Sequence, residues 1–299
     1  MIQTSPPEAH TPAPLPANAC LAPGYTVIQH LHRGSALDVY DVWSERRQCR
    51  CVAKVLRPDR VAEPAARRRL LREGRLLVRM SHPHIVRAYE ILEAPQPVVI
   101  LETLTGATLA YLVEDNPRGL GLSDVVVLGL QLCSAVHYLH GHGVLHLDIK
   151  PSNIVCEHGM AKLLDFDIAR GAGRGHRWGT REYMAPEQAA GGMLSPATDV
   201  WGIGVVLFEA ATGRLPFDFD SGATYPQLTG SAESIRQYRR VPGAFARAVE
   251  GALEPAPERR LSILELARVL ASLGVPDSEW MAPPRSGDSE ATRRPRSGF

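Results

Sequence analysis

Two short stretches of the chain decide its fold: His146-Leu147-Asp148-Ile149-Lys150-Pro151-Ser152-Asn153, and Asp165-Phe166-Asp167, which begins twelve residues after Asn153. This spacing lets a loop and a following hairpin bring one base, one cation and two oxygen ligands to a single point, namely Asp148, Lys150, Asn153 and Asp165. Phosphoryl transfer needs these groups, because the protein mainly positions the nucleophile and neutralises charge on the phosphate oxygens, partly through Mg²⁺. Magnesium favours a few hard oxygen ligands. The two stretches therefore predict a phosphoryl-transfer centre.

Length and composition indicate an ordinary globular protein. The 299 residues suggest two lobes or one large domain, and 44% hydrophobic with 22% charged residues is a usual balance. A net charge of +1 gives no sign of nucleic-acid binding, so no nucleic-acid partner is expected. No apolar run approaches the roughly 18 residues of a transmembrane helix, so no membrane span is expected.

The N-terminus and the cysteines indicate a cytoplasmic protein. The N-terminus is Pro-rich and lacks the basic start and apolar core of a signal peptide. The five cysteines form no Cys-x-x-Cys metal spacing, and reduced thiols are expected. The oligomeric state is not written in these features.

The ends of the chain have the composition of disordered segments. Residues 1–22 are rich in Pro, Ala, Ser and Thr, which cannot bury a core. Residues 276–299 form a basic tail of similar character. Residues 23–275 are therefore expected to form the folded part.

The folded part changes from strand-like to helical along its length. Alternating or short apolar runs predict strands at residues 25–28, 38–43, 51–56 and 97–102, with one helix at 63–80 among them. Beyond residue 105, one apolar stripe predicts a long helix that Ser123 could cap; it consists of Leu128, Leu132, Ala135 and Leu139. Further helices are expected at about 198–211, 243–253 and 262–272. The pattern predicts a small sheet lobe followed by a larger helical lobe.

The collinear order of several motifs resembles the eukaryotic-type (Hanks-type) serine/threonine protein kinases, and most closely their bacterial members. Besides the first two stretches, residues 179–187 (Gly-Thr-Arg-Glu-Tyr-Met-Ala-Pro-Glu) and 199–204 (Asp-Val-Trp-Gly-Ile-Gly) match. The resemblance covers about 24–272. It implies a bilobal α+β fold, with an antiparallel sheet and one helix in an N-lobe at 23–103 and a mainly helical C-lobe at 104–275. It also implies ATP and Mg²⁺ as cofactors, and protein substrates that carry Ser or Thr.

The resemblance assigns residues of the sheet lobe to ATP. The family's phosphate-covering loop reads G-x-G-x-x-G-x-V, and residues 32–39 match it only at Gly34 and Val39. Leu31 and Val39 would pack on the adenine. Lys54, in Val52-Ala53-Lys54, would contact the α- and β-phosphates, with Ala53 in the same binding strand. The backbone of Glu102 and Leu104 would hydrogen-bond the adenine, although these residues also read as an ordinary strand end.

Glu73 is the implied partner of Lys54. Its alternative is an exposed i,i+4 pair with Arg69 on a very basic helix. The His-Pro-x-Ile-Val run that follows favours the Lys54 partner. Gly74 costs this helix about 1 kcal/mol relative to Ala, which would make the helix mobile.

In the helical lobe, the resemblance gives each polar residue a role. Asp148 would orient the substrate hydroxyl, and Lys150 would stabilise the moving phosphoryl group. Asn153 and Asp165 would hold Mg²⁺. Glu187 and Arg260 would form a structural ion pair.

Two residues depart from the family pattern. Leu147 stands where an Arg usually receives the phosphate of a modified activation loop, and Thr180 is the only Ser or Thr in residues 168–184. Activity is therefore expected not to need activation-loop phosphorylation. Asp167 stands where the metal loop usually has Gly. Asp tolerates left-handed backbone angles, and in an extended segment Asp167 would point to the same side as Asp165, as a second carboxylate near Mg²⁺ or a modulator of the loop.

Three functions fit these motifs. The first is an active serine/threonine protein kinase in cytoplasmic signalling, favoured because the base, both lysines, Glu73 and both metal ligands are present. The second is a pseudokinase or nucleotide-binding scaffold, suggested by His32 and Leu37 in the phosphate loop and by Asp167. The third is a small-molecule kinase, which the protein-substrate motifs disfavour.

Overall fold

A computed structural model of the protein describes residues 12–175, 177–220 and 222–274, and these divide into two compact units. The first, here called the sheet unit, contains residues 12–79 and 87–103. The second, the helical unit, contains residues 80–86 and 104–274. The predicted α+β class, with a sheet-rich part and a mainly helical part, is confirmed. The predicted lobe boundary is wrong for residues 80–86, because backbone bonds such as Val86 N–H to Leu163 O tie them to the helical unit.

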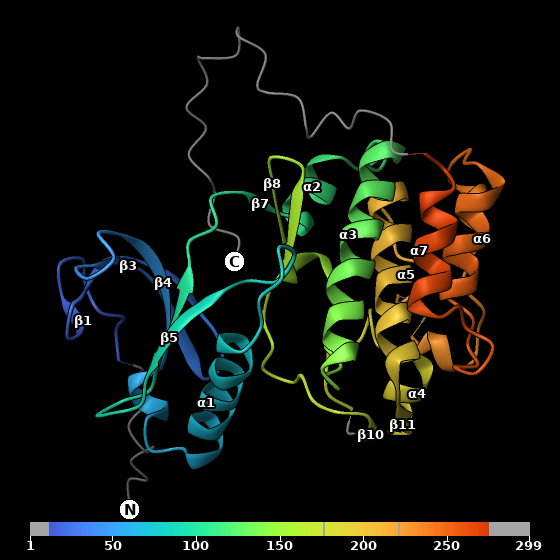
Figure 1. The fold of residues 1–299 in the computed structure, drawn as a ribbon. Helices are drawn as coiled ribbons and strands as arrows, with labels where there is room; N and C mark the ends of the chain where they lie inside the picture. Colours follow the sequence, from blue (N-terminus) through green and yellow to red (C-terminus); the bar gives the residue numbers. More distant parts are fainter. Residues whose placement is uncertain (1–11, 176, 221, 275–299) are drawn as a thin grey trace, which may run out of the picture. The chain divides into compact units, whose positions relative to one another are not determined.

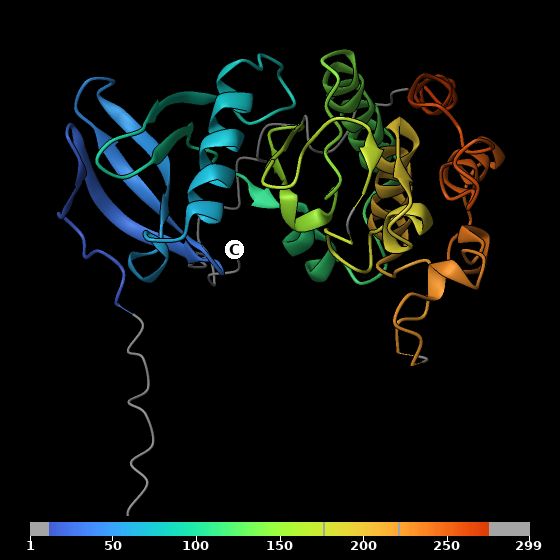
Figure 2. The same cartoon turned by 90° about the horizontal axis from the view of Figure 1, so that it is seen from below.

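The sheet unit is one antiparallel sheet with a helix on one face (Figures 1 and 2). Its strand order is β1-β2-β3-β4-β6-β5, and helix α1 contacts β4, β5 and β6. Its elements are β1 (Cys20–Ala22), β2 (Tyr25–Arg33), β3 (Leu37–Ser44), β4 (Cys49–Leu56), the 3-10 turn η1 (Pro58–Arg60), α1 (Pro64–Val78), β5 (Ala88–Leu92) and β6 (Val98–Glu102). The strands predicted at 25–28, 38–43, 51–56 and 97–102 correspond to β2, β3, β4 and β6.

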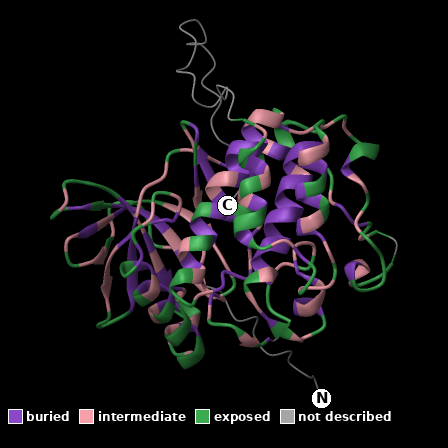
Figure 3. Cartoon of the chain, turned by 45° about the vertical axis from the view of Figure 1, so that its right-hand side comes forward, coloured by how far each residue is buried: buried purple, intermediate pink, exposed green. Residues whose placement is uncertain are grey.

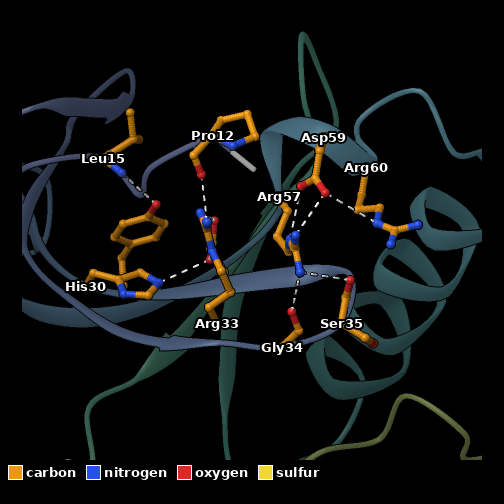
Figure 4. Close-up of polar contacts among 11 residues, drawn as sticks. Pro12, Leu15, His30, Arg33, Gly34, Ser35, Arg57, Asp59 and Arg60 are labelled. Carbon is orange, nitrogen blue, oxygen red and sulfur yellow. Dashed lines mark hydrogen bonds and ion pairs between the residues drawn. The ribbon is translucent and has the colours of Figure 1, made fainter. Parts of the chain in front are cut away.

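The prediction of a disordered segment at 1–22 is wrong for its second half. Residues 12–22 are described, and Cys20–Ala22 forms strand β1 beside β2. The Leu15 N–H donates to the Tyr40 hydroxyl at 2.9 Å, and Arg33 donates to the Pro12 carbonyl at 2.6 Å (Figure 4). Composition misled here because the sheet supplies partners for the segment's backbone. Residues 1–11 and the tail predicted at 276–299 lie outside the described residues.

Helix α1 approaches the sheet at a glycine. A Cβ atom on Gly74 would lie 2.7 Å from Val99 Cγ2 and 3.0 Å from Ile91 Cγ1, closer than side chains tolerate. Gly74 is itself buried, as are Leu70, Glu73 and Leu77 on the same helix. The glycine that looked like a weakness of the helix therefore lets the helix pack closely on β5 and β6.

The helical unit is built around two long apolar helices, α3 and α5, which contact each other (Figure 1). Figure 3 shows the helices at the centre of this unit mainly in the buried colour. The helices are α2 (Leu109–Asp115), α3 (Leu122–Gly141), α4 (Pro186–Ala189), α5 (Pro196–Thr212), α6 (Gly243–Ala252) and α7 (Ile263–Ala271), with 3-10 turns η2 (Pro151–Asn153), η3 (Pro226–Leu228) and η4 (Ile235–Gln237). Helices α3, α5, α6 and α7 match the predicted positions.

Two small sheets position the loops of this unit. Strands β7 (Ala107–Thr108), β8 (Ile154–Glu157) and β9 (Met160–Leu163) form one antiparallel sheet. Strands β10 (Gly173–Arg174) and β11 (Met193–Leu194) form the other.

The predicted cap of α3 is wrong. The N-cap is Gly121 without a side-chain hydrogen bond, and Ser123 lies within the helix. A Cβ on Gly121 would lie 2.9 Å from Asp124 Oδ2, so the acidic side chain of the first turn occupies the capping region.

Helix α3 is long and apolar enough to cross a membrane by length and composition, although no continuous apolar run in the sequence reaches that length. Most of the helix is buried inside the helical unit, against α5 and α7. A core helix passes the same test of composition, and the burial of Leu128, Leu132 and Leu139 is that of a core helix.

We predict that Gly74→Ala lowers the free energy of unfolding by about 1–3 kcal/mol, because the added methyl group overpacks the contact with Val99 and Ile91. Ala is the better helix former, so helix propensity alone predicts the opposite sign. Denaturant titration measures the change. Gly141→Ala in α3 is the matched control, because nothing lies within 4 Å of its Cβ position. Equal stability changes for the two variants would contradict the packing argument.

Candidate active site

The loop that carries Asp148 is held by one buried carboxylate. Asp199, in the first turn of α5, accepts the N–H of His146 at 2.9 Å and the N–H of Leu147 at 2.8 Å. His140 Nε2 lies 2.9 Å from the same carboxylate. Leu147 has a φ of 71°, a left-handed conformation that costs a non-glycine residue roughly 1–2 kcal/mol. The two backbone hydrogen bonds to Asp199 offset that cost and fix the turn before Asp148.

The His146 ring links this loop to the Asp165 stretch. Its Nδ1 accepts the Asp148 N–H at 3.2 Å, which makes Nε2 the donor to the Leu164 carbonyl at 2.9 Å. The ring also meets Phe166 edge-on at 4.7 Å between centroids. Because both groups are buried, the backbone around residues 146–148 and 164–166 is tied together from inside the unit.

Asp148 lies at the centre of a hydrogen-bond network. Asn153 Nδ2 donates to the Asp148 carboxylate at 3.0 Å and to its carbonyl at 3.0 Å. Thr180 donates to Asp148 Oδ1 through both its N–H and its hydroxyl, each at 2.9 Å. Lys150 Nζ lies 2.9 Å from Asp148 Oδ2 and donates to the Thr180 hydroxyl at 2.7 Å. The structure thus brings the predicted base and the predicted cation into direct contact.

Of the two predicted metal ligands, Asn153 belongs to this network, and Asp165 lies close to Asn153 along the backbone. Leu164 N–H donates to the Asn153 carbonyl at 2.8 Å, and the β8–β9 pairing continues from Ile154 and Leu163. Asp165 therefore follows directly after the residue paired with Asn153. The Asn153 amide nitrogen donates to Asp148, so the Oδ1 atom of Asn153 points away from Asp148. An amide oxygen and a carboxylate are hard oxygen ligands, and this donor set fits Mg²⁺.

The backbone at Asp167 differs from the expectation. The positive φ of this stretch falls on Asp165, at 58°, and Asp167 is not among the left-handed residues of the described chain. Asp167 instead lies in a turn that the Ala169 N–H closes by donating to the Phe166 carbonyl at 3.1 Å. Asp167 therefore does not use the left-handed conformation that Asp would tolerate at this position. A role of Asp167 as a metal ligand or loop modulator stays a prediction.

Leu147 is part of an apolar cluster. Its side chain is buried with Leu145 and Leu194, and the partly buried Ile168 packs against them. The segment after Asp167 is also paired with its neighbours: Leu145 and Arg170 exchange backbone hydrogen bonds at 2.7 and 3.0 Å, and β10 pairs with β11. Packing and backbone hydrogen bonds thus hold this segment in place.

Gln188 is a residue that the sequence reasoning missed. Its buried amide donates to the Leu147 carbonyl at 2.8 Å and to the Trp178 carbonyl at 2.6 Å. It therefore bridges the Asp148 loop and the segment before Thr180. Its position directly after Glu187 in a family motif was the only available signal.

Glu187 and Arg260 form the expected ion pair. Arg260 Nη1 and Nη2 donate to the two Glu187 oxygens at 2.8 and 3.0 Å, and the Arg260 side chain is fully buried. Thr198 donates to Glu187 Oε1 at 2.9 Å, and Trp201 stacks 5.1 Å from the guanidinium. A bidentate buried pair of this kind joins the start of α4 to α5 and to the turn before α7.

Tyr183 and Glu209 form a second pair, which is partly buried. Burial raises the pKa of Glu209, and the Tyr183 hydroxyl, which donates to its Oε2 at 2.7 Å, offsets part of that rise. Burial and the neighbouring Glu209 carboxylate also raise the pKa of Tyr183. Both residues line a cavity of about 310 Å³ in the helical unit.

In the sheet unit, Lys54 Nζ donates to Glu73 Oε1 at 2.7 Å. The Glu73 side chain is fully buried and that of Lys54 is 14% exposed, so this is not a surface pair. The alternative of an exposed pair between Glu73 and Arg69 is excluded by that burial. The close approach of α1 at Gly74 brings Glu73 to the strand that carries Lys54.

The assignment of Ala53 to the ATP site is wrong. Ala53 is fully buried in the core on the face of the sheet opposite to Lys54, among Tyr40, Val42 and Ile100. Successive strand residues point to opposite faces, so Val52 shares the Lys54 face. Val52 is partly exposed, and it is the residue that the period-two pattern should have selected.

The other residues predicted to bind ATP are placed as follows. Val39 pairs with Lys54 across β3 and β4 and is partly exposed. Leu31 is partly exposed at an irregularity in the β2–β3 pairing. Glu102 ends β6, and its N–H donates to the Arg87 carbonyl at 2.9 Å. Leu104 follows two residues later and is partly exposed.

Comparison with known proteins identifies the family. The protein kinase domain model matches residues 25–269, so the chain belongs to the protein kinase family. It is 35% identical over 231 residues to the serine/threonine-protein kinase PkaA of Streptomyces coelicolor, an overlap that covers 73% of this chain and 42% of that protein. It is 32% identical over 206 residues to the probable serine/threonine-protein kinase PknB of Lactococcus lactis, covering 66% and 33%. With PknB of Mycolicibacterium smegmatis it shares 35% over 183 residues, covering 56% and 29%.

These relatives are bacterial serine/threonine kinases, as the resemblance predicted. The matched part of the chain spans only about a third of the length of these curated relatives.

We predict that Asp199→Asn lowers the free energy of unfolding by about 2–3 kcal/mol, because its amide would direct donors at the N–H groups of His146 or Leu147. Denaturant titration measures the loss. Asp115→Asn makes the same chemical change at an exposed position of α2 and is expected to be nearly neutral. If both variants unfold alike, Asp199 does not hold the loop.

Proposed function

We propose that this chain is an active protein kinase that transfers the γ-phosphate of ATP to Ser or Thr hydroxyl groups of proteins. The observation that carries the proposal is the network around Asp148, in which Lys150, Asn153 and Thr180 all contact one carboxylate. Membership of the family and the names of the relatives support the substrate class.

Asp148 acts on the substrate hydroxyl in this proposal. Its Oδ1 already accepts a hydroxyl group, that of Thr180, which supports the capacity of this carboxylate to orient an incoming Ser or Thr hydroxyl. Lys150 is held beside it and supplies positive charge to the phosphate oxygens during transfer. Positioning of the nucleophile and neutralisation of charge are the main contributions a protein makes to this reaction.

Asn153 and Asp165 would hold the Mg²⁺ that accompanies ATP, and the metal would neutralise charge on the phosphates. Lys54, fixed by Glu73, supplies a point charge for the α- and β-phosphates. Leu31, Val39 and Val52 contribute apolar surface to the adenine in this proposal.

A test is the transfer of radiolabelled phosphate from ATP to a generic protein substrate in the presence of Mg²⁺. Asp148→Asn is expected to lower the rate by about 10²–10⁴-fold, the usual contribution of a positioned base. Lys54→Met is expected to lower it strongly as well, through lost phosphate contacts. Asp115→Asn is the exposed control and should leave the rate unchanged.

A wild-type protein that binds ATP but transfers no label would contradict this proposal. It would favour the scaffold that the single glycine of the phosphate loop suggested.

We also propose that activity does not require phosphorylation of residues 168–184. The single Ser or Thr of that segment is Thr180, whose hydroxyl is bonded to Asp148 and Lys150. A phosphate there would set negative charge against Asp148. The apolar packing of Leu147 and the pairing of Arg170 with Leu145 support a segment held without phosphate.

We predict that the enzyme keeps its activity after treatment with a phosphatase, because no phosphate is needed to order this segment. Mass spectrometry of the treated protein verifies that the phosphate is gone, and the label-transfer rate before and after treatment is the measurement. Complete loss of activity that returns on phosphorylation of the segment would refute the proposal.

A further inference from the structure

The turn between β2 and β3 is the phosphate-covering loop of the family pattern, with Gly34 as its one matching glycine. Glycines in such a loop let backbone N–H groups approach phosphates. Here the Gly34 N–H is already used, since it donates to the Leu37 carbonyl at 2.8 Å. The loop must therefore present other N–H groups if it is to contact phosphate.

The carbonyl groups of this turn are all engaged. Arg57 Nη1 donates to the Gly34 carbonyl at 3.1 Å and to the Ser35 carbonyl at 3.3 Å (Figure 4). The backbone N–H of Arg57 donates to the Ala36 carbonyl at 3.0 Å. Arg57 thus contacts three consecutive carbonyls from the residue that follows β4.

The Arg57 guanidinium is itself fixed. Its Nε and Nη2 donate to the two Asp59 oxygens at 3.0 and 2.8 Å, a bidentate pair that Figure 4 shows beside the loop. The Arg57 side chain is only 13% exposed. Because the guanidinium is planar, the bidentate pair with Asp59 sets the direction in which Nη1 of Arg57 points.

The direction of the carbonyls determines the direction of the N–H groups. In a trans peptide the C=O and the following N–H point to opposite sides. The carbonyls of Gly34 and Ser35 point toward Arg57, so the N–H groups of Ser35 and Ala36 point away from it. Neither N–H donates a hydrogen bond within the described part of the chain. Successive unpaired N–H groups of a turn form a concave site for an anion.

We propose that Arg57 is a positioning residue for nucleotide phosphate: it holds the carbonyls of Gly34 and Ser35 so that the N–H groups of Ser35 and Ala36 face the phosphate. Arg57 thereby performs the task that extra glycines perform in the family pattern. This inference rests on the proposed function, because it assumes that the loop meets the phosphates of ATP.

The test compares the binding of ATP and of adenosine to the full chain by calorimetry, in the presence of Mg²⁺. Arg57→Ala is expected to weaken ATP binding about tenfold, roughly the effect of one charge-assisted hydrogen bond, and to leave adenosine binding unchanged. Arg57→Lys keeps the charge but lacks the fork, so a similar loss of ATP affinity is expected. Hydrogen exchange at the Gly34 amide should become faster in both variants, because the turn loosens.

Arg60→Ala is the matched control. It removes the same charge beside the same Asp59, but Arg60 makes no contact with the loop carbonyls and its side chain is 42% exposed. It should change neither affinity. If Arg57→Ala does not fold, Arg57→Lys still tests whether the guanidinium group of Arg57 positions the loop.

Four outcomes would overturn the inference. If Arg57→Ala and Arg60→Ala weaken ATP binding equally, or if Arg57→Lys binds ATP as tightly as the wild type, only the charge matters. Positioning of the loop by Arg57 is then refuted, while the proposed kinase function stands. If the adenosine affinity falls with that for ATP, the effect is not specific to phosphate. If the wild type binds neither ligand, the proposed function fails together with the inference.

Discussion

The bonds between the Asp199 carboxylate and the backbone N–H groups of His146 and Leu147 are the constraint on which the rest of the helical-unit site depends. Asp199 is buried in the first turn of α5, so its position is set by the packing of that core helix. Asp199 thereby stabilises the left-handed backbone conformation of Leu147, which a leucine residue disfavours. The turn in turn directs Asp148 toward Asn153, Thr180 and Lys150. The Asp148 carboxylate is thus placed by the hydrophobic core, through the buried acceptor Asp199.

The parts of the site that the sequence predicted are those encoded by short spacing. Lys150 and Asn153 lie within five residues of Asp148 and both contact its carboxylate, and a hairpin brings the backbone before Asp165 beside Asn153. The role of Asp165 as a metal ligand stays a prediction. The pairing of Lys54 with Glu73 needed a helix and a family resemblance, and the buried contact agrees. The prediction for Ala53 is wrong because successive strand residues point to opposite faces, so the direct neighbour of Lys54 lies on the other side of the sheet. Arg57 and Gln188 could not be predicted in this way, because they donate to backbone carbonyls, which every residue has and no residue pattern identifies.

Three parts of the sheet unit, namely Gly74, the phosphate loop and residues 12–22, show why composition alone misjudges local structure. Gly74 reads as a weak point in a helix, yet the methyl group it lacks would meet Val99, so its absence allows Glu73 to reach Lys54. The turn between β2 and β3 shows the opposite case, because it has one glycine where the family pattern has three, and Arg57, paired with Asp59, binds its carbonyls. The same argument applies to residues 12–22, whose composition is that of a disordered segment but whose backbone finds Tyr40 and Arg33 on the sheet. In each case a long-range partner outweighs the local propensity.

Position 147 and the phosphate loop both differ from the family pattern in the same physical direction. Position 147, where the family pattern usually has an arginine, is a leucine that packs against Leu145 and Leu194. The turn between β2 and β3, where the family pattern has three glycines, has one glycine, and its carbonyls accept hydrogen bonds from Arg57. A contact that is always available removes the entropy cost of ordering a segment at the moment of use, and it also removes the opportunity to control that moment.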